Sequence, residues 1–120
     1  MQKDKKRENN ADSSTTYQGW ENYATWCVEV WLTNDSGSYH YWRDRTRSTV
    51  RGAWSMDGVI KGLWTESEAS RISLAEQLKE ATHGESPLQE ASVYTDLLGS
   101  ALDDVNWSEI AASFIENFCD

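Results

Sequence analysis

The 120-residue sequence lacks the features that mark membrane, secreted and disulfide-stabilised proteins. It has one proline, Pro87, and two cysteines, Cys27 and Cys119, whose separation matches no metal or redox spacing. Cys27 is interpreted as a small core residue, and a disulfide to Cys119 stays an open alternative. No apolar run approaches the roughly 18 residues that a membrane span needs. No apolar segment follows the charged N-terminus, as a signal peptide requires, so a cytoplasmic location is expected.

Residues suited to catalysis are also scarce. Neither histidine, His40 or His83, is followed by a second histidine or a glutamate at the metal-ligand spacings HxxxH or HxxE. Asp103 and Asp104 are adjacent, and adjacent side chains on a helix do not face each other. We therefore expect a non-enzymatic protein with no metal and no cofactor. An enzyme would require His40 and Tyr41 to line a pocket together with a carboxylate.

The net negative charge comes entirely from the second half of the chain. Residues 1–60 carry 8 Lys or Arg and 8 Asp or Glu, whereas residues 61–120 carry 3 and 12, a net charge of 3 − 12 = −9. Phosphate contacts need cations, so nucleic-acid binding by this half is not expected. Carboxylates held on helices can instead imitate a nucleic-acid backbone and attract the basic groove of a DNA-binding protein. The candidate partner-binding residues are Glu76, Glu80, Asp96, Asp103, Asp104, Glu109 and Glu116. The plain alternative is that these charges only keep the protein in solution.

The N-terminal part divides into a polar tail and the start of a helical domain. Residues 1–16 contain no large apolar residue after Met1, which predicts a disordered tail, and residues 17–120 then form one helical domain. Six of the seven tryptophans lie in the first 64 residues, so we expect the heavy part of the core there. Apolar residues at 23, 26, 27, 30 and 31 predict a helix capped by Asn22, which buries Tyr23, Trp26 and Trp31 and stops at 34–37.

A second helix is expected from about Ser38 to Arg51, and it offers the alternative binding site. Its arginines recur every four residues beside aromatic side chains, a combination that can serve single-stranded nucleic acid or an acidic partner. The other interpretation is that Asp44, Glu29 or the acidic second half neutralises them. The alternative binding residues are Tyr39, Tyr41, Trp42, Arg43, Arg47 and Arg51.

The remaining chain predicts helices only. Residues 52–67 fit either a short helix between two turns or a packed loop. A helix is expected from Glu66 to Thr82, another opened by Ser86-Pro87, and a last one from Asn106, with Asn106 and Glu109 forming a variant capping box. The predicted fold is all-α, a compact bundle of four to five helices.

Two stretches of the sequence resemble a known family. Gly19-Trp20-x-Asn22-Tyr23-x-Thr25-Trp26, continued by Val28, Trp31-Leu32 and Asn34-Asp35, is similar to the signature of small proteins of bacteriophages, plasmids and related mobile elements. Val105-Asn106-Trp107-Ser108-Glu109-Ile110-Ala111, with the apolar segment before it, resembles that family's second signature. Ala24 departs from the pattern, because an acidic residue is common there. The family carries a domain of unknown function, so the resemblance implies a bacterial host cell and no mechanism. By analogy it favours an inhibitor of host defence, against CRISPR or restriction systems.

Overall fold

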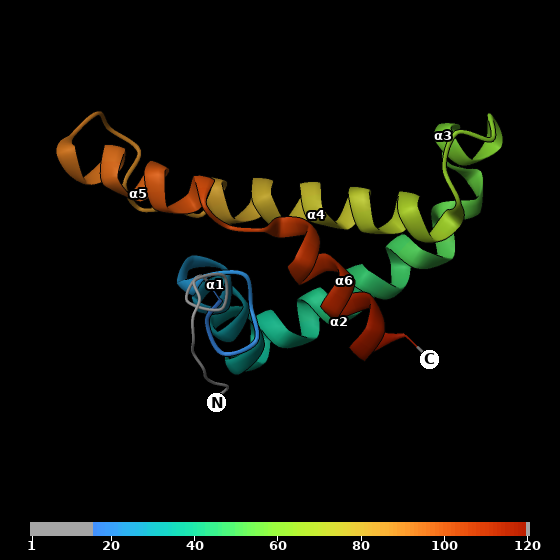
Figure 1. The fold of residues 1–120 in the computed structure, drawn as a ribbon, viewed down its shortest axis with the longest axis horizontal. Coiled ribbons are helices and arrows are strands. Elements are labelled where there is room, and N and C mark those ends of the chain that lie inside the picture. Colours follow the sequence, from blue (N-terminus) through green and yellow to red (C-terminus); the bar gives the residue numbers. More distant parts are fainter. Residues whose placement is uncertain (1–15, 120) are drawn as a thin grey trace.

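Five helices longer than one turn make up the fold in the computed structural model, which describes residues 16–119 (Figure 1). They are α1 (Tyr23–Asn34), α2 (Ser36–Gly52), α4 (Glu66–Gly84), α5 (Val93–Asp103) and α6 (Trp107–Phe118). The predicted all-α fold is confirmed. The described part contains no β-strand, only an isolated bridge between Tyr17 and Trp20, and none of its helices is long and apolar enough to span a membrane. The predicted tail, residues 1–16, lies outside the described residues except for Thr16.

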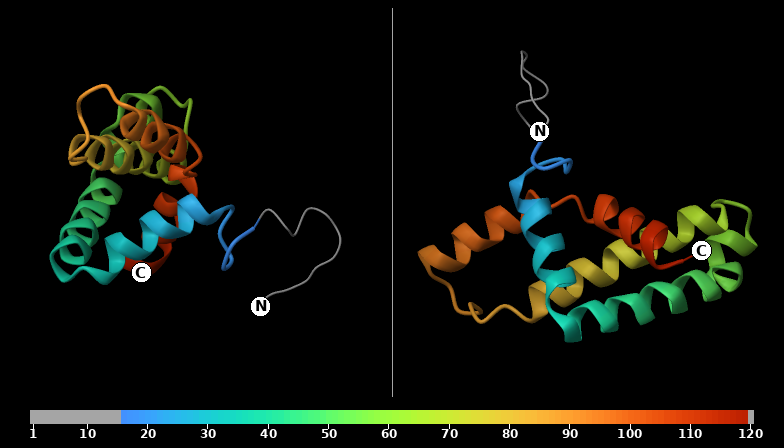
Figure 2. Two further views of the ribbon diagram at one scale, coloured as in Figure 1. Left: turned by 90° about the vertical axis from the view of Figure 1, so that its left-hand side faces the viewer. Right: turned by 90° about the horizontal axis from the view of Figure 1, so that it is seen from below.

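The helices pack around the pair α4 and α6. α2 runs alongside both of them, and α1 crosses near the start of α2, at the side where the chain enters the domain (Figures 1 and 2). α5 extends away from this body at one end, opposite to the end where the 3₁₀ turn η2 (Ala53–Ser55) and the short α3 (Asp57–Ile60) lie (Figure 1). α5 therefore has fewer neighbours than the other long helices.

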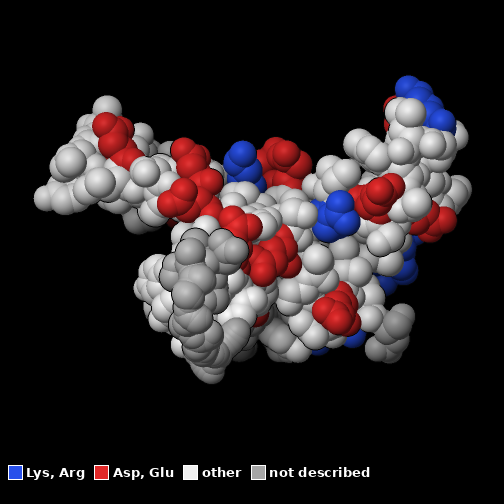
Figure 3. All heavy atoms as spheres, in the orientation of Figure 1, with Lys and Arg blue, Asp and Glu red and all other residues white. Residues whose placement is uncertain are grey.

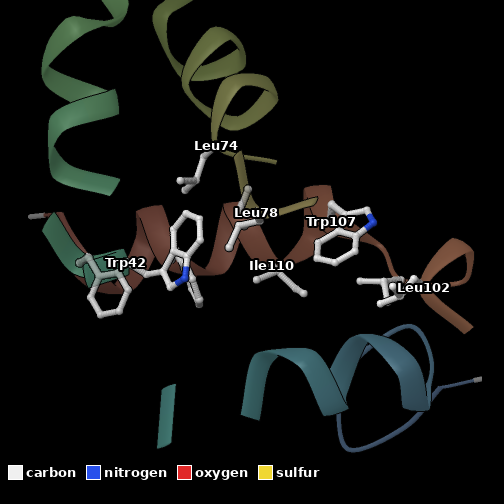
Figure 4. Packing of buried hydrophobic residues seen from close by; sticks show 10 residues of the cluster. Trp42, Leu74, Leu78, Leu102, Trp107 and Ile110 are labelled. Atoms are coloured by element: carbon white, nitrogen blue, oxygen red, sulfur yellow. The ribbon is translucent and has the colours of Figure 1, made fainter. Parts of the chain in front are cut away.

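The core lies between α2, α4 and α6, and most of its side chains come from the second half of the chain. Leu74 and Leu78 of α4 meet Ile110 and Phe114 of α6, and Trp42 of α2 closes one side (Figure 4). The expectation of an N-terminal core was wrong. Among the six tryptophans of the first 64 residues only Trp42 is buried, and Trp31, Trp54 and Trp64 are exposed. The aliphatic and phenylalanine residues of α4 and α6 repeat at helical spacing on one side, and two such stripes bury each other fully.

The buried face of α1 also differs from the prediction. The helix turns Ala24, Thr25, Val28 and Leu32 toward the domain, whereas Tyr23 and Trp31 are 57% and 73% exposed. Tyr23 and Trp26 instead pack against Tyr17 on the surface, with ring centroids 5.2 and 4.9 Å from that of Tyr17. The prediction placed the largest apolar side chains of α1 on its buried face. That face is wrong because hydrogen bonds made by the fully buried Thr25 fix how α1 is rotated.

Capping side chains account for the helix boundaries. Asn22 caps α1 as predicted, and Asp35 accepts the N–H of Ser38, so α2 begins at Ser36. The predicted helix opened by Ser86-Pro87 is wrong. Ser86 Oγ accepts the N–H of Leu88 within a loop, and α5 begins only at Val93, after its own cap Ser92.

The remaining segments agree more closely with the sequence. In residues 52–67 the short-helix alternative is the observed one, in the form of η2 and α3. α4 begins at Glu66 as predicted, behind a capping box of Thr65 and Glu68, and continues through Gly84. Cys27 and Cys119 are both free thiols, so the disulfide alternative is excluded in this structure.

Candidate partner-binding surface

A network of hydrogen bonds, here called the clasp, joins the start of α1 to the start of α6. It consists of Glu21, Asn22, Thr25, Asn106 and Glu109. The hydroxyl of Thr25 donates to Asn22 Oδ1 at 2.7 Å and accepts the backbone N–H of Asn106 at 2.9 Å. Asn22 Nδ2 donates to the carbonyl of Asp104 at 2.8 Å. Because Asn22 and Asn106 also cap α1 and α6, the clasp holds two helix N-termini in a fixed relation.

Glu21 and Glu109 complete the clasp by reciprocal contacts. The backbone N–H of Glu21 donates to Glu109 Oε1 at 3.1 Å, and Asn106 Nδ2 donates to Glu21 Oε1 at 2.6 Å. The predicted capping box at α6 is therefore only half formed. Asn106 accepts the N–H of Glu109 at 3.0 Å, but the Glu109 carboxylate binds the chain before α1 instead of its own cap. Both stretches that carry the family resemblance meet in this network, which gives their asparagine and threonine residues a structural role.

The clasp positions an acidic surface, here called the acidic band. It comprises Asp96 and Asp103 of α5, Asp104 at the α5–α6 junction, Glu109 and Glu116 of α6, and Glu21 beside Glu109. All are exposed except the half-buried Glu109. Figure 3 shows acidic side chains following one another from α5 across the middle of this face; most Lys and Arg lie toward α2 and α3, and some lie beside the acidic side chains near the middle.

The segment that carries most of the acidic band contains no cation of its own. Residues 80–120 contain nine Asp or Glu and no Lys or Arg. The nine are Glu80, Glu85, Glu90, Asp96, Asp103, Asp104, Glu109, Glu116 and Asp120. Uncompensated carboxylates on a rigid surface give a negative potential that reaches about 8–10 Å into solvent at physiological salt. Such a surface attracts a basic partner from a distance.

The predicted partner-binding residues thus fall into two groups. Asp96, Asp103, Asp104, Glu109 and Glu116 lie in the acidic band. Glu76 and Glu80 are exposed on α4, on the opposite side of that helix from the buried Leu74 and Leu78, and do not belong to the band. The sequence analysis did not identify Glu21 as a member of this surface. Glu21 lies about 85 residues before its hydrogen-bond partner Asn106 in the sequence, and no local pattern marks it.

A polar cleft of about 310 Å³ lies at the α6 end of the acidic band. Gly19 and Trp20 form one side, and Glu109, Ser113 and Glu116 of α6 form the other. The turn before α1 reaches this position because Gln18 and Gly19 both adopt positive φ, which lets Tyr17 and Trp20 exchange backbone hydrogen bonds of 2.7 Å. The cleft adds an indole face beside two carboxylates, a combination that suits an arginine or lysine side chain.

The alternative site on α2 is largely occupied by structural contacts. Trp42 is 5% exposed in the core, and Tyr39 packs edge-on against Phe118 with centroids 5.3 Å apart. Arg47 Nε donates to the carbonyl of Phe118 at 2.8 Å, where it satisfies the C-terminus of α6. Arg43 pairs with Asp44 at 3.2 Å, as one of the two interpretations expected. Tyr41 and Arg51 are exposed.

The described residues also bear on catalysis and metal binding. His40 and Tyr41 are exposed, and the His40 ring lies against Tyr39 with centroids 5.5 Å apart. His83 lies in the last turn of α4, with its ring 6.3 Å from that of Trp107. Within residues 16–119 no group of three or more His, Cys, Asp or Glu residues is arranged to hold a metal ion.

No protein-family model, curated protein or solved structure matches this chain.

Proposed function

We propose that this protein is a non-enzymatic inhibitor that binds a basic, nucleic-acid-binding surface of a host defence complex through its acidic band. The charge distribution carries the proposal, because five carboxylates on α5 and α6, with Glu21, face solvent or one another and residues 80–120 supply no cation to neutralise them. A protein surface that evolved only for solubility usually mixes the two signs of charge. The band does not.

The rigidity of the acidic band supports the same proposal. Three hydrogen bonds of the clasp tie the segment from Asp104 to Glu109 to the start of α1, so the backbone of this segment and the Glu109 carboxylate are held in place before any partner arrives. A preorganised charged surface loses little conformational entropy on binding. The resemblance to proteins of mobile elements adds the context, since inhibitors of CRISPR and restriction systems occur on such elements and some imitate DNA; this support is analogy.

The test is capture of the partner from host lysate at low salt. A tagged protein is used as bait, bound proteins are eluted with a salt gradient, and mass spectrometry identifies them. We expect a nuclease or another subunit of a defence complex to elute at moderate salt and DNA to compete for it. Steep salt dependence is expected because ions screen the charges of the band.

Two variants provide the control. Asp103→Asn with Asp104→Asn removes two charges from the band, while the backbone carbonyl that Asn22 binds is retained. Glu66→Gln removes an exposed charge at the distant start of α4. The double variant should weaken capture about tenfold or more, and Glu66→Gln should leave it near the wild-type level. Capture that persists unchanged in high salt, or equally in both variants, contradicts the proposal.

A further inference from the structure

An apolar groove between α1 and α5 is a second surface that the acidic band does not use. Cys27 and Trp31 of α1 form one wall, Leu98 and Leu102 of α5 form the other, and Pro87 of the preceding loop closes one end. The groove has a volume of about 560 Å³. It lies where α5 extends away from the body of the fold (Figure 1).

α5 carries more apolar surface than its position explains. Leu102 is buried, Leu98 one turn earlier is half-buried, and Tyr94 one turn before that is 68% exposed. Leu97 beside them is 64% exposed. A helix that lies on the surface normally shows polar residues on its outer side, so this apolar ridge leads from the core into solvent without a partner.

The exposed area is on the scale of a protein-binding surface. Trp31 and Tyr94 are each about 70% exposed and together leave roughly 200–350 Å² of aromatic surface in water. Leu97 and Val93 add exposed apolar surface on other sides of α5. Apolar patches of a few hundred Å² on a monomer commonly mark binding sites, and aromatic residues in such patches contribute most to affinity.

Charge decides what kind of partner fits the groove. Neither α1 nor α5 contains a Lys or Arg, while Glu29 lies on α1, Asp96 and Asp103 lie on α5, and Glu85 lines the groove itself. Two copies of this chain that met through this face would bring acidic rims together, which is unfavourable. A cationic partner is complementary.

Backbone hydrogen bonding decides the partner's conformation. The backbone groups of α1 and α5 are bonded within the helices or by their caps, so the groove walls offer no strand edge to an extended peptide. A helix brings its own backbone hydrogen bonds and needs only side-chain pockets. We infer that the α1–α5 groove binds an amphipathic helix of a partner protein, with apolar anchors at i, i+3, i+4 and i+7 and Lys or Arg beside them. The groove shares only Asp96 and Asp103 of its rim with the acidic band.

The test uses a fluorescein-labelled peptide of about 18 residues, with Leu at the anchor positions and Lys elsewhere, long enough to fold as a helix when bound. Fluorescence anisotropy with the full chain should show saturable binding. A matched peptide with Glu in place of Lys should bind at least tenfold more weakly. Equal binding of the two peptides, or no binding of the Leu/Lys peptide, overturns the inference.

Variants of the full chain locate the contact. Trp31→Ser with Leu97→Ser should weaken binding of the Leu/Lys peptide at least tenfold, because both side chains are exposed and their loss leaves the core intact. Leu63→Ser removes a comparably exposed leucine next to α3, at the other end of the molecule, and should leave the affinity unchanged. Leu97→Lys should also repel the Leu/Lys peptide. Equal losses in the groove variant and Leu63→Ser overturn the inference.

Two further measurements distinguish peptide binding in the groove from dimer formation and from binding by the acidic band. If light scattering shows a dimer that Trp31→Ser with Leu97→Ser dissociates, the occupant is a second copy and the inference is wrong. Asp104→Asn with Glu116→Gln removes two exposed charges of the acidic band outside α1 and α5, and it should weaken capture of the defence complex about tenfold while peptide binding falls less than threefold. The results can therefore contradict the proposed function of the acidic band without contradicting peptide binding by the groove, and the reverse.

Discussion

The hydroxyl of Thr25 lies between the caps of two helices that are far apart in the sequence. It accepts the backbone N–H of Asn106 at 2.9 Å and donates to Asn22 Oδ1 at 2.7 Å, and its side chain is fully buried. One oxygen thus connects the N-cap of α1 with the N-cap of α6. The rotation of α1 and its position against the start of α6 depend on this contact.

Thr25→Val tests the energetic role of the clasp. Valine has nearly the same shape, so the change removes the hydroxyl and leaves the N–H of Asn106 without its acceptor. An unsatisfied polar group of this kind costs about 1–3 kcal/mol in free energy of unfolding. Urea denaturation should show this loss. Thr25→Ser keeps the hydroxyl and should cost about 1 kcal/mol or less, for one lost methyl group. Equal losses in the two variants would show that packing alone holds α1.

Gly58→Ala should destabilise the turn between α3 and α4. A Cβ atom at Gly58 would lie 2.5 Å from Cε3 of Trp64, and the Gly58 carbonyl also accepts the N–H groups of Leu63 and Trp64. The indole ring must move, which should cost about 1–3 kcal/mol in urea denaturation. Gly99→Ala in α5 is the matched control. A Cβ there meets nothing within 4 Å, so alanine should raise stability by about 0.5–1 kcal/mol. A stabilising Gly58→Ala would contradict the observed close approach.

Local sequence signals predicted the ends of the helices better than they predicted which side chains are buried. Asn22 and Asn106 were correctly identified as caps because a cap is decided by the residue and the three that follow it. Ser86-Pro87 has the right residue types for a helix start, yet Ser86 closes a turn, since Ser92 offers a second cap immediately before the apolar residues of α5. Two valid caps close together cannot be ranked from the sequence.

Long-range contacts account for the errors in the core and the candidate surface. Trp31 fits the apolar face of α1 by spacing, but the buried hydrogen bond of Thr25 turns that face outward. Trp42 suits base stacking by composition, but it fills the space between α4 and α6. The acidic residues were identified from charge alone, and their division between α4 and the acidic band follows from where α5 lies, which no local pattern encodes.

Glu29→Gln should stabilise the protein at neutral pH. Burial raises the pKa of the Glu29 carboxyl, and the hydrogen bond from Thr33 opposes this only in part. A folded-state pKa above the unfolded value means that ionisation favours unfolding, so the penalty is present above the folded pKa and is lost as the pH falls through it. Thermal unfolding should give a higher Tm for Glu29→Gln than for wild type at pH 7. The difference should shrink toward pH 3. A lower Tm for the variant at pH 7 would contradict this assignment.

Direct binding of nucleic acid by α2 should be absent. Trp42 is buried, Arg47 binds the C-terminus of α6 and Arg43 pairs with Asp44, so among the predicted residues only Tyr41 and Arg51 stay exposed without such a contact, fewer groups than the several stacking aromatics and arginines of a single-strand site. A gel-shift assay with single- and double-stranded DNA and RNA at low salt should therefore show no complex. A shift that disappears in Arg51→Gln, an exposed arginine of α2, would restore α2 as a binding surface. A shift that survives in Arg51→Gln but not after removal of residues 1–15 would assign binding to the lysine-rich N-terminal segment.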